Sequence, residues 1–139
     1  MNYYLDTNII IYALKGEYPR IKEHFENIHS SSIIIPEIVL SEIEYGARKS
    51  NDYQKTIDLY NRFTDSFSTI SMNAFSRKEY GNIRSLLEKE GKLIGPNDLI
   101  IASIVKAENG ILVTHNTKEF EKVPGLKIED WTIWTVHKN

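Results

Sequence analysis

Three carboxylates lie among apolar residues in this chain. Asp6 interrupts the run "YYLDTNIII", and Asp98 precedes "LIIASIV". Glu42 lies in "PEIVLSEIEYG", where helical spacing surrounds it with mostly apolar neighbours. A buried carboxylate without a partner is costly and tends to take up a proton. The sequence therefore raises the question of what partner these three acids share.

A hard divalent cation would answer that question. Magnesium prefers oxygen ligands and octahedral geometry, and it retains bound water. Such a site can activate a water and shield the charge that develops on a phosphodiester. We therefore expect Asp6 and Asp98 to bind metal, and Glu42 to complete the acidic site directly or through a bound water.

Each acid also has a structural explanation when it is taken alone. Asp6 could be an acid at a strand-to-helix junction, and Glu42 could pair with Lys or Arg at the edge of an apolar stripe. Asp98 could be a helix-start acid with Asn97 as the N-cap. Convergence favours the metal site, because three carboxylates brought together without a partner would repel one another strongly.

The elements that must position these acids alternate between short strands and helices. Apolar strands are expected at residues 3–5, 32–35, 67–71, 111–114 and 127–128. Helices are expected at 8–14, 18–28, 36–48, 52–63, 74–90 and 98–108. This alternation predicts an α/β fold with a parallel sheet covered on both faces. Sites in such sheets lie beyond the carboxyl ends of the strands, where Asp6 and His115-Asn116 fall.

Length and composition limit the other possibilities. The 139 residues are expected to form one domain, 1–139. A net charge of −2 counts mildly against nucleic-acid binding, but basic residues outnumber acidic ones once the site acids are set aside. The absence of cysteine excludes disulfides and thiolate chemistry. With no apparent signal peptide or membrane span, we expect a cytoplasmic protein without membrane contact.

The chain resembles the PIN-domain ribonucleases, specifically the VapC toxins of bacterial type II toxin–antitoxin pairs. The matching stretches lie in family order over nearly the whole chain: "YLDTNIIIYALKG", "IPEIVLSEIEYG", "IGPNDLIIASIVKAENGILVTHNTKEF" and "VPGLKIEDW". The resemblance implies a three-layer α/β/α sandwich on a short parallel sheet of four or five strands. It also places Asp6, Glu42 and Asp98 at the acidic metal-site positions of the family.

The same resemblance implies an activity and partners. The expected function is a Mg²⁺-dependent endoribonuclease toxin, with Mn²⁺ as a substitute. Its substrate would be single-stranded RNA, a tRNA loop in the branch that this chain looks most like, cut to 5′-phosphate and 3′-hydroxyl ends. Family members dimerise and are neutralised by a cognate antitoxin, so a homodimer and an antitoxin partner are expected.

One position departs from the family pattern. Many members have a fourth acid where this chain has Asn116, and Glu119 follows three residues later. Glu119 either replaces the missing acid or closes a capping box with Asn116 as the N-cap. We favour the catalytic role, because three carboxylates leave a two-metal site short of ligands. Asn8, Thr114 and Asn116 are expected to orient the ligands from behind them.

Three other functions are alternatives for a small α/β protein with acids at its strand ends. A signalling receiver domain needs an acidic pair after the first strand and an acid after the third, but only Asp6 follows the first and "FSTIS" supplies none. An Asp-x-Asp phosphatase needs an acid where Asn8 stands. A catalytically weak or inactive PIN-fold module that binds RNA or protein stays open, because Asn116 replaces the fourth acid.

Overall fold

Five parallel strands form the centre of the molecule in a computed structural model that describes residues 1–133. The strand order is β3-β2-β1-β4-β5, and every neighbouring pair is parallel. The strands are β1 (Tyr3–Leu5), β2 (Ile33–Pro36), β3 (Ser68–Ile70), β4 (Ile111–Val113) and β5 (Lys127–Glu129). The last six residues of the expected domain, 134–139, lie outside the described part.

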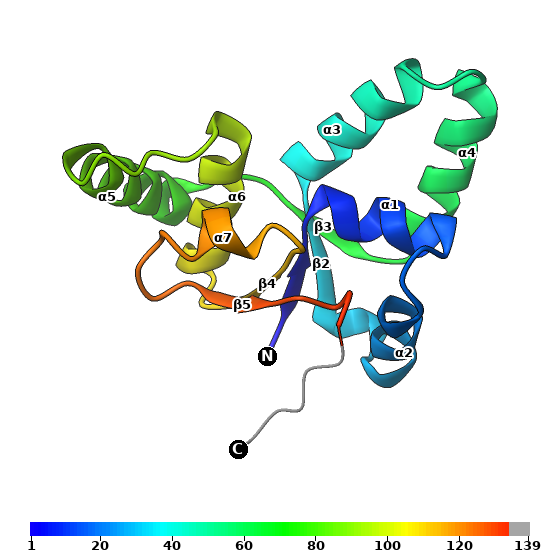
Figure 1. The fold of residues 1–139 in the computed structure, drawn as a ribbon, viewed down its shortest axis with the longest axis horizontal. Helices are drawn as coiled ribbons and strands as arrows, with labels where there is room; N and C mark the ends of the chain where they lie inside the picture. Colours follow the sequence, from blue (N-terminus) through cyan, green and yellow to red (C-terminus); the bar gives the residue numbers. More distant parts are fainter. Residues whose placement is uncertain (134–139) are drawn as a thin grey trace.

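Helices cover both faces of this sheet. Figure 1 shows α5, α6 and α7 on one side of the strands and α1 to α4 on the other. The helices are α1 (Thr7–Lys15), α2 (Pro19–Asn27), α3 (Glu37–Arg48), α4 (Tyr53–Thr64), α5 (Ala74–Lys89), α6 (Pro96–Ala107) and α7 (Thr117–Phe120), with a 3₁₀ turn at Ser30–Ser32. The predicted three-layer α/β/α sandwich is confirmed.

The core explains why the strands do not alternate between apolar and polar residues. Tyr4 and Leu5 of β1 and Leu112 and Val113 of β4 are all buried, because helices pack on both faces of the sheet. Trp131, after β5, is also fully buried and stacks on His24 of α2, with ring centroids 5.1 Å apart. This contact joins the segment after β5 to the layer of helices that contains α2.

The helix starts differ from the expected ones. α6 begins at Pro96, two residues earlier than predicted, with Gly95 as the N-cap. The fixed φ of proline suits the first helical position, so the helix extends to it. Asn97 is therefore not the N-cap, and that part of the structural explanation of Asp98 is wrong. α1 begins at Thr7 because Asp6 caps it. No helix within residues 1–133 is long and apolar enough to cross a membrane.

Candidate active site

Asp6 and Thr114 meet at the carboxyl ends of two neighbouring strands. Asp6 follows β1 and is only 6% exposed. One of its oxygens, Oδ1, accepts a hydrogen bond at 2.8 Å from the backbone N–H of Thr7, the first residue of α1. The other, Oδ2, accepts one from the hydroxyl of Thr114 at 2.7 Å. Parallel pairing of β1 with β4 brings these side chains together, and both carboxylate oxygens of Asp6 are fixed in direction.

Glu42 reaches the same region from α3. Its Oε1 accepts a hydrogen bond from the hydroxyl of Thr7, and its Oε2 accepts one from the side-chain amide of Asn97 at 3.3 Å. Glu42 is half-buried and takes part in none of the ion pairs among residues 1–133. The explanation of Glu42 as an edge residue paired with Lys or Arg is therefore wrong. Neutral donors hold this carboxylate instead.

Asp98 shows that the acids influence one another electrostatically. It lies in the first turn of α6 and is half-buried. Burial, followed by the negative charges of Asp6, Glu42 and Glu119, raises the pKa of Asp98 to about 6. Burial also raises the pKa of Asp6, whereas its hydrogen bonds from Thr114 and Thr7 lower it. A single field of negative charge thus arises from one side chain before α1, one on α3, one in the first turn of α6 and one on α7.

Glu119, the acid that we favour for the fourth position, does not take part in capping its helix. Asn116 precedes α7, but its side chain makes no capping hydrogen bond, so the capping box that was the alternative role for Glu119 is absent. The Glu119 carboxylate instead accepts a hydrogen bond from Nζ of Lys122 at 3.1 Å. Its charge contributes to the raised pKa of Asp98. Glu119 therefore lies near enough to Asp98 to affect its titration.

The residues expected to orient the acids behave differently from one another. Thr114 is fully buried, donates to Asp6 and accepts the backbone N–H of Asn116 at 3.0 Å. Asn8 is exposed and makes no hydrogen bond to the four acids within residues 1–133. Thr7 and Asn97 donate hydrogen bonds to the Glu42 carboxylate, a role that was not predicted from the sequence. Their position next to Asp6 and Asp98 was the signal that could have identified them.

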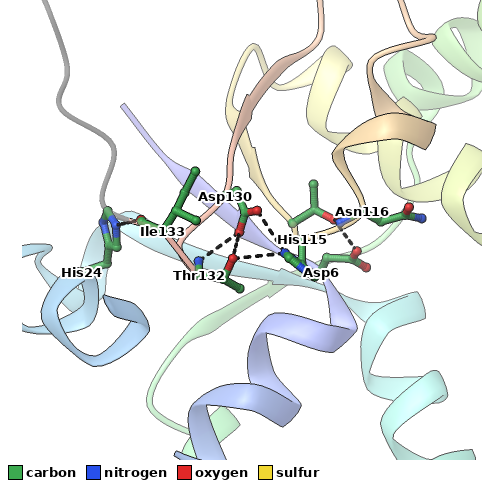
Figure 2. A network of polar contacts seen from close by, with 8 residues as sticks. Asp6, His24, His115, Asn116, Asp130, Thr132 and Ile133 are labelled. Atoms are coloured by element: carbon green, nitrogen blue, oxygen red, sulfur yellow. Dashed lines mark hydrogen bonds and ion pairs between the residues drawn. The ribbon is translucent and has the colours of Figure 1, made fainter. Parts of the chain in front are cut away.

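His115 belongs to a separate polar network beside the site, which Figure 2 shows. Its Nδ1 lies 3.0 Å from Oδ2 of Asp130 and 3.1 Å from the hydroxyl of Thr132. The rings of Tyr12 and Tyr18 lie against the imidazole, with centroids 5.9 and 5.6 Å away. These contacts tie the loop after β4 to the turn after β5. His115 thus has a structural role in positioning the loop that carries Thr114.

The donor set fits a hard divalent cation. Among the described residues, no basic side chain forms an ion pair with Asp6, Glu42 or Asp98, so their charge is not neutralised by protein. Carboxylate oxygens are the ligands that Mg²⁺ and Mn²⁺ prefer. However, no three Asp, Glu or His side chains within residues 1–133 form a ready-made coordination shell. Mg²⁺ is commonly held by one or two carboxylates together with retained waters, and Asp6 and Asp98 would supply such a pair.

Comparison with known proteins extends this picture. The family model of the PIN domain matches residues 3–126. The chain is 38% identical over 135 residues to "Ribonuclease VapC2" of Rickettsia felis, a match that covers 94% of this chain and 98% of that protein. It is 33% identical over 132 residues to "tRNA(fMet)-specific endonuclease VapC" of Shigella flexneri, covering 95% and 99% of the two chains.

Solved structures give the same result. A crystal structure of VapBC2 from Rickettsia felis bound to a DNA fragment from its promoter has a chain that aligns with a TM-score of 0.86 at 37% identity, covering 94% of this chain and 99% of that one. A DNA-bound VapBC from Salmonella typhimurium aligns with a TM-score of 0.87 at 33% identity, covering 94% and 98%. The similarity therefore extends over nearly the full length in both sequence and fold.

Proposed function

Because this chain belongs to the PIN-domain family of VapC ribonucleases, we propose that Asp6, Glu42, Asp98 and Glu119 form the centre of a magnesium-dependent endoribonuclease. The protein is a ribonuclease toxin of a toxin–antitoxin system. The observation that carries the assignment of the centre is the convergence of these acids: burial, followed by the negative charges of Asp6, Glu42 and Glu119, raises the pKa of Asp98 to about 6. No basic group among the described residues neutralises Asp6, Glu42 or Asp98.

In this proposal Asp6 and Asp98 hold Mg²⁺ or Mn²⁺, and Glu42 and Glu119 complete the site. The bound ion supplies activation of the attacking water and neutralises charge on the phosphodiester. The hydroxyl of Thr114 fixes the direction of the Asp6 carboxylate, and the hydroxyl of Thr7 fixes one oxygen of Glu42. Such supporting hydrogen bonds orient ligands and tune their basicity.

The proposed reaction is hydrolysis of an RNA phosphodiester by in-line attack of water, which leaves 5′-phosphate and 3′-hydroxyl ends. Single-stranded RNA, and a tRNA loop in particular, is the proposed substrate, supported by the name of the Shigella flexneri relative. A cognate antitoxin is the proposed partner, supported by the VapBC complexes among the similar structures. A homodimer in the cytoplasm completes the proposal.

The proposal is tested by incubating the purified toxin, freed of antitoxin, with total tRNA in Mg²⁺ or in EDTA and mapping the new ends. We expect discrete cuts with 5′-phosphate ends in Mg²⁺ and none in EDTA. Asp6→Asn should abolish the cuts, whereas Glu121→Gln, at an exposed glutamate just after α7, should not. Cleavage that persists in EDTA, or ends carrying a cyclic phosphate, would contradict the metal-dependent mechanism. RNA binding without cleavage would favour the inactive binding module.

A further inference from the structure

A hollow of about 420 Å³ opens beside Glu42 on the surface of the protein. It is lined by Ser41, Glu42, Tyr45 and Asn97. Two of these residues belong to the hydrogen bond that joins Asn97 to the Glu42 carboxylate. The hollow is therefore continuous with the acidic site, and three of its four lining residues are polar.

Tyr45 is the aromatic member of this hollow. It lies three residues after Glu42 on α3, so both side chains lie on the same face of the helix. Its side chain is 67% exposed, an unusual degree for a large aromatic ring. A ring this exposed does not stabilise the core, yet it forms a wall of a cavity that a carboxylate of the proposed centre also lines.

We propose that Tyr45 is a substrate-positioning residue, on whose ring an unpaired RNA base stacks next to the phosphodiester to be cut. Single-stranded RNA is recognised chiefly by splaying bases onto aromatic side chains. The polar lining suits the rest of the subsite, because the Ser41 hydroxyl and the Asn97 amide can bond to base edges. This inference rests on the ribonuclease function and adds a site for one base to it.

Lys49 extends the same surface by one helical turn. Its Nζ lies 5.1 Å from the centroid of the Tyr45 ring. Both side chains are exposed, so the ammonium can leave the ring for an RNA phosphate without unfolding anything. We expect a phosphate adjoining the stacked base to contact Lys49, which would offset some of the repulsion between RNA and the acidic centre.

The first test compares variants of Tyr45 in Mg²⁺-dependent cleavage of a single-stranded oligoribonucleotide that spans the cut mapped on tRNA. Tyr45→Ala should raise KM by roughly 5- to 100-fold, the effect of losing one stacked base, and change kcat much less. Tyr45→Phe and Tyr45→Trp should retain the parent KM. Tyr45→Leu should behave like Tyr45→Ala, because it keeps bulk but loses the π face. Phe75→Ala is the control: Phe75 on α5 is 72% exposed and does not line the hollow.

The second test locates the base. Single abasic substitutions are placed along the same oligoribonucleotide, and each is measured with the parent and with Tyr45→Ala. In the parent, one abasic position should raise KM by the same factor as Tyr45→Ala does. The same abasic position should raise KM little further in the Tyr45→Ala variant. Independent effects at every position would overturn the proposal, as would a Leu variant that rescues activity.

Binding keeps the inference testable even if cleavage fails. The dissociation constant of fluorescein-labelled oligouridylate, measured by anisotropy at several salt concentrations, should rise in Tyr45→Ala and stay near the parent value in Tyr45→Phe. In Lys49→Ala, the plot of log affinity against log salt should become less steep by about 1, the change expected for the loss of one phosphate contact. A Tyr45→Ala protein that binds RNA normally but loses self-association or antitoxin binding would assign Tyr45 to a protein interface and overturn the proposal. Failure of the parent to cleave any RNA would instead refute the proposed function.

Discussion

The variant Thr114→Val tests the hydrogen bond that the Thr114 hydroxyl donates to Asp6. Valine has nearly the shape of threonine, so packing at this fully buried position is retained while the hydroxyl is lost. The change removes the 2.7 Å hydrogen bond to Oδ2 of Asp6 and the acceptor for the backbone N–H of Asn116. Asn116 is exposed and its N–H can turn to water, but Asp6 is buried. The main effect therefore falls on Asp6.

The expected magnitude follows from that geometry. A hydrogen bond to a charged group contributes about 1.5–3 kcal/mol, and leaving the acceptor buried costs a similar amount. We expect Thr114→Val to lower the free energy of unfolding by about 1.5–3 kcal/mol at neutral pH. The hydroxyl of Thr114 lowers the pKa of Asp6, so its loss should raise that pKa further above its ordinary value. A ligand carboxylate must be ionised, and the acidic limb of the pH–rate profile should therefore move to higher pH.

Urea unfolding and the pH dependence of kcat/KM measure these two effects. Ser103→Ala is the matched control, because Ser103 also has a buried hydroxyl, which donates to the backbone oxygen of Leu99 at 2.6 Å within α6. It should alter stability modestly and leave the pH profile unchanged. A Thr114→Val protein with the parent's activity and acidic limb would refute the view that Thr114 supports a catalytic Asp6.

Three further predictions concern the other acids. The raised pKa of Asp98, about 6 against an ordinary 3.8, means that the folded protein binds this proton more tightly than the unfolded chain. In EDTA, the free energy of unfolding should therefore fall as pH rises from about 4 to above 6. Urea titrations should show a smaller fall in Asp98→Asn. An equally steep fall in that variant would contradict the raised pKa of Asp98. Glu42→Gln should reduce RNA cleavage and should also reduce the rise in melting temperature that Mg²⁺ causes. Glu44 is an exposed neighbour on α3, and Glu44→Gln should change neither quantity. Equal effects of the two variants would remove Glu42 from the site. Glu119→Gln should keep stability within about 0.5 kcal/mol, since no capping box is lost, but cleave far less RNA; full activity would leave the site to the other three acids.

The arrangement of Asp6 and Thr114 could be predicted from the sequence. Apolar strands that do not alternate predict a parallel sheet covered on both faces, and parallel strands end at a common edge. Asp6 and Thr114 each follow such a strand, so their proximity depends only on β1 and β4 being neighbours. The helical spacing around Glu42 likewise placed it at the apolar face of α3.

The contacts between separate elements could not be predicted in the same way. Asn97 looked like an N-cap, and its bond to Glu42 depends on how α6 packs near α3, which no local pattern specifies. The capping box at Asn116 and Glu119 matched a known sequence signature. It fails because Asn116 has φ −87° and ψ 55°, outside the extended region typical of an N-cap, while Lys122 offers Glu119 a charged partner.

Direct measurement of metal binding tests the central claim, that these acids form one cation site. Metal-free protein is titrated with Mn²⁺, and free Mn²⁺ is followed by electron paramagnetic resonance at pH 7.5, with Glu44→Gln as the control variant. We predict saturable binding to the parent and to Glu44→Gln, competition by Mg²⁺, and loss of that binding in Asp6→Asn and in Asp98→Asn. Equal Mn²⁺ binding by the parent and these two variants would contradict the account, because the cation would then lie elsewhere.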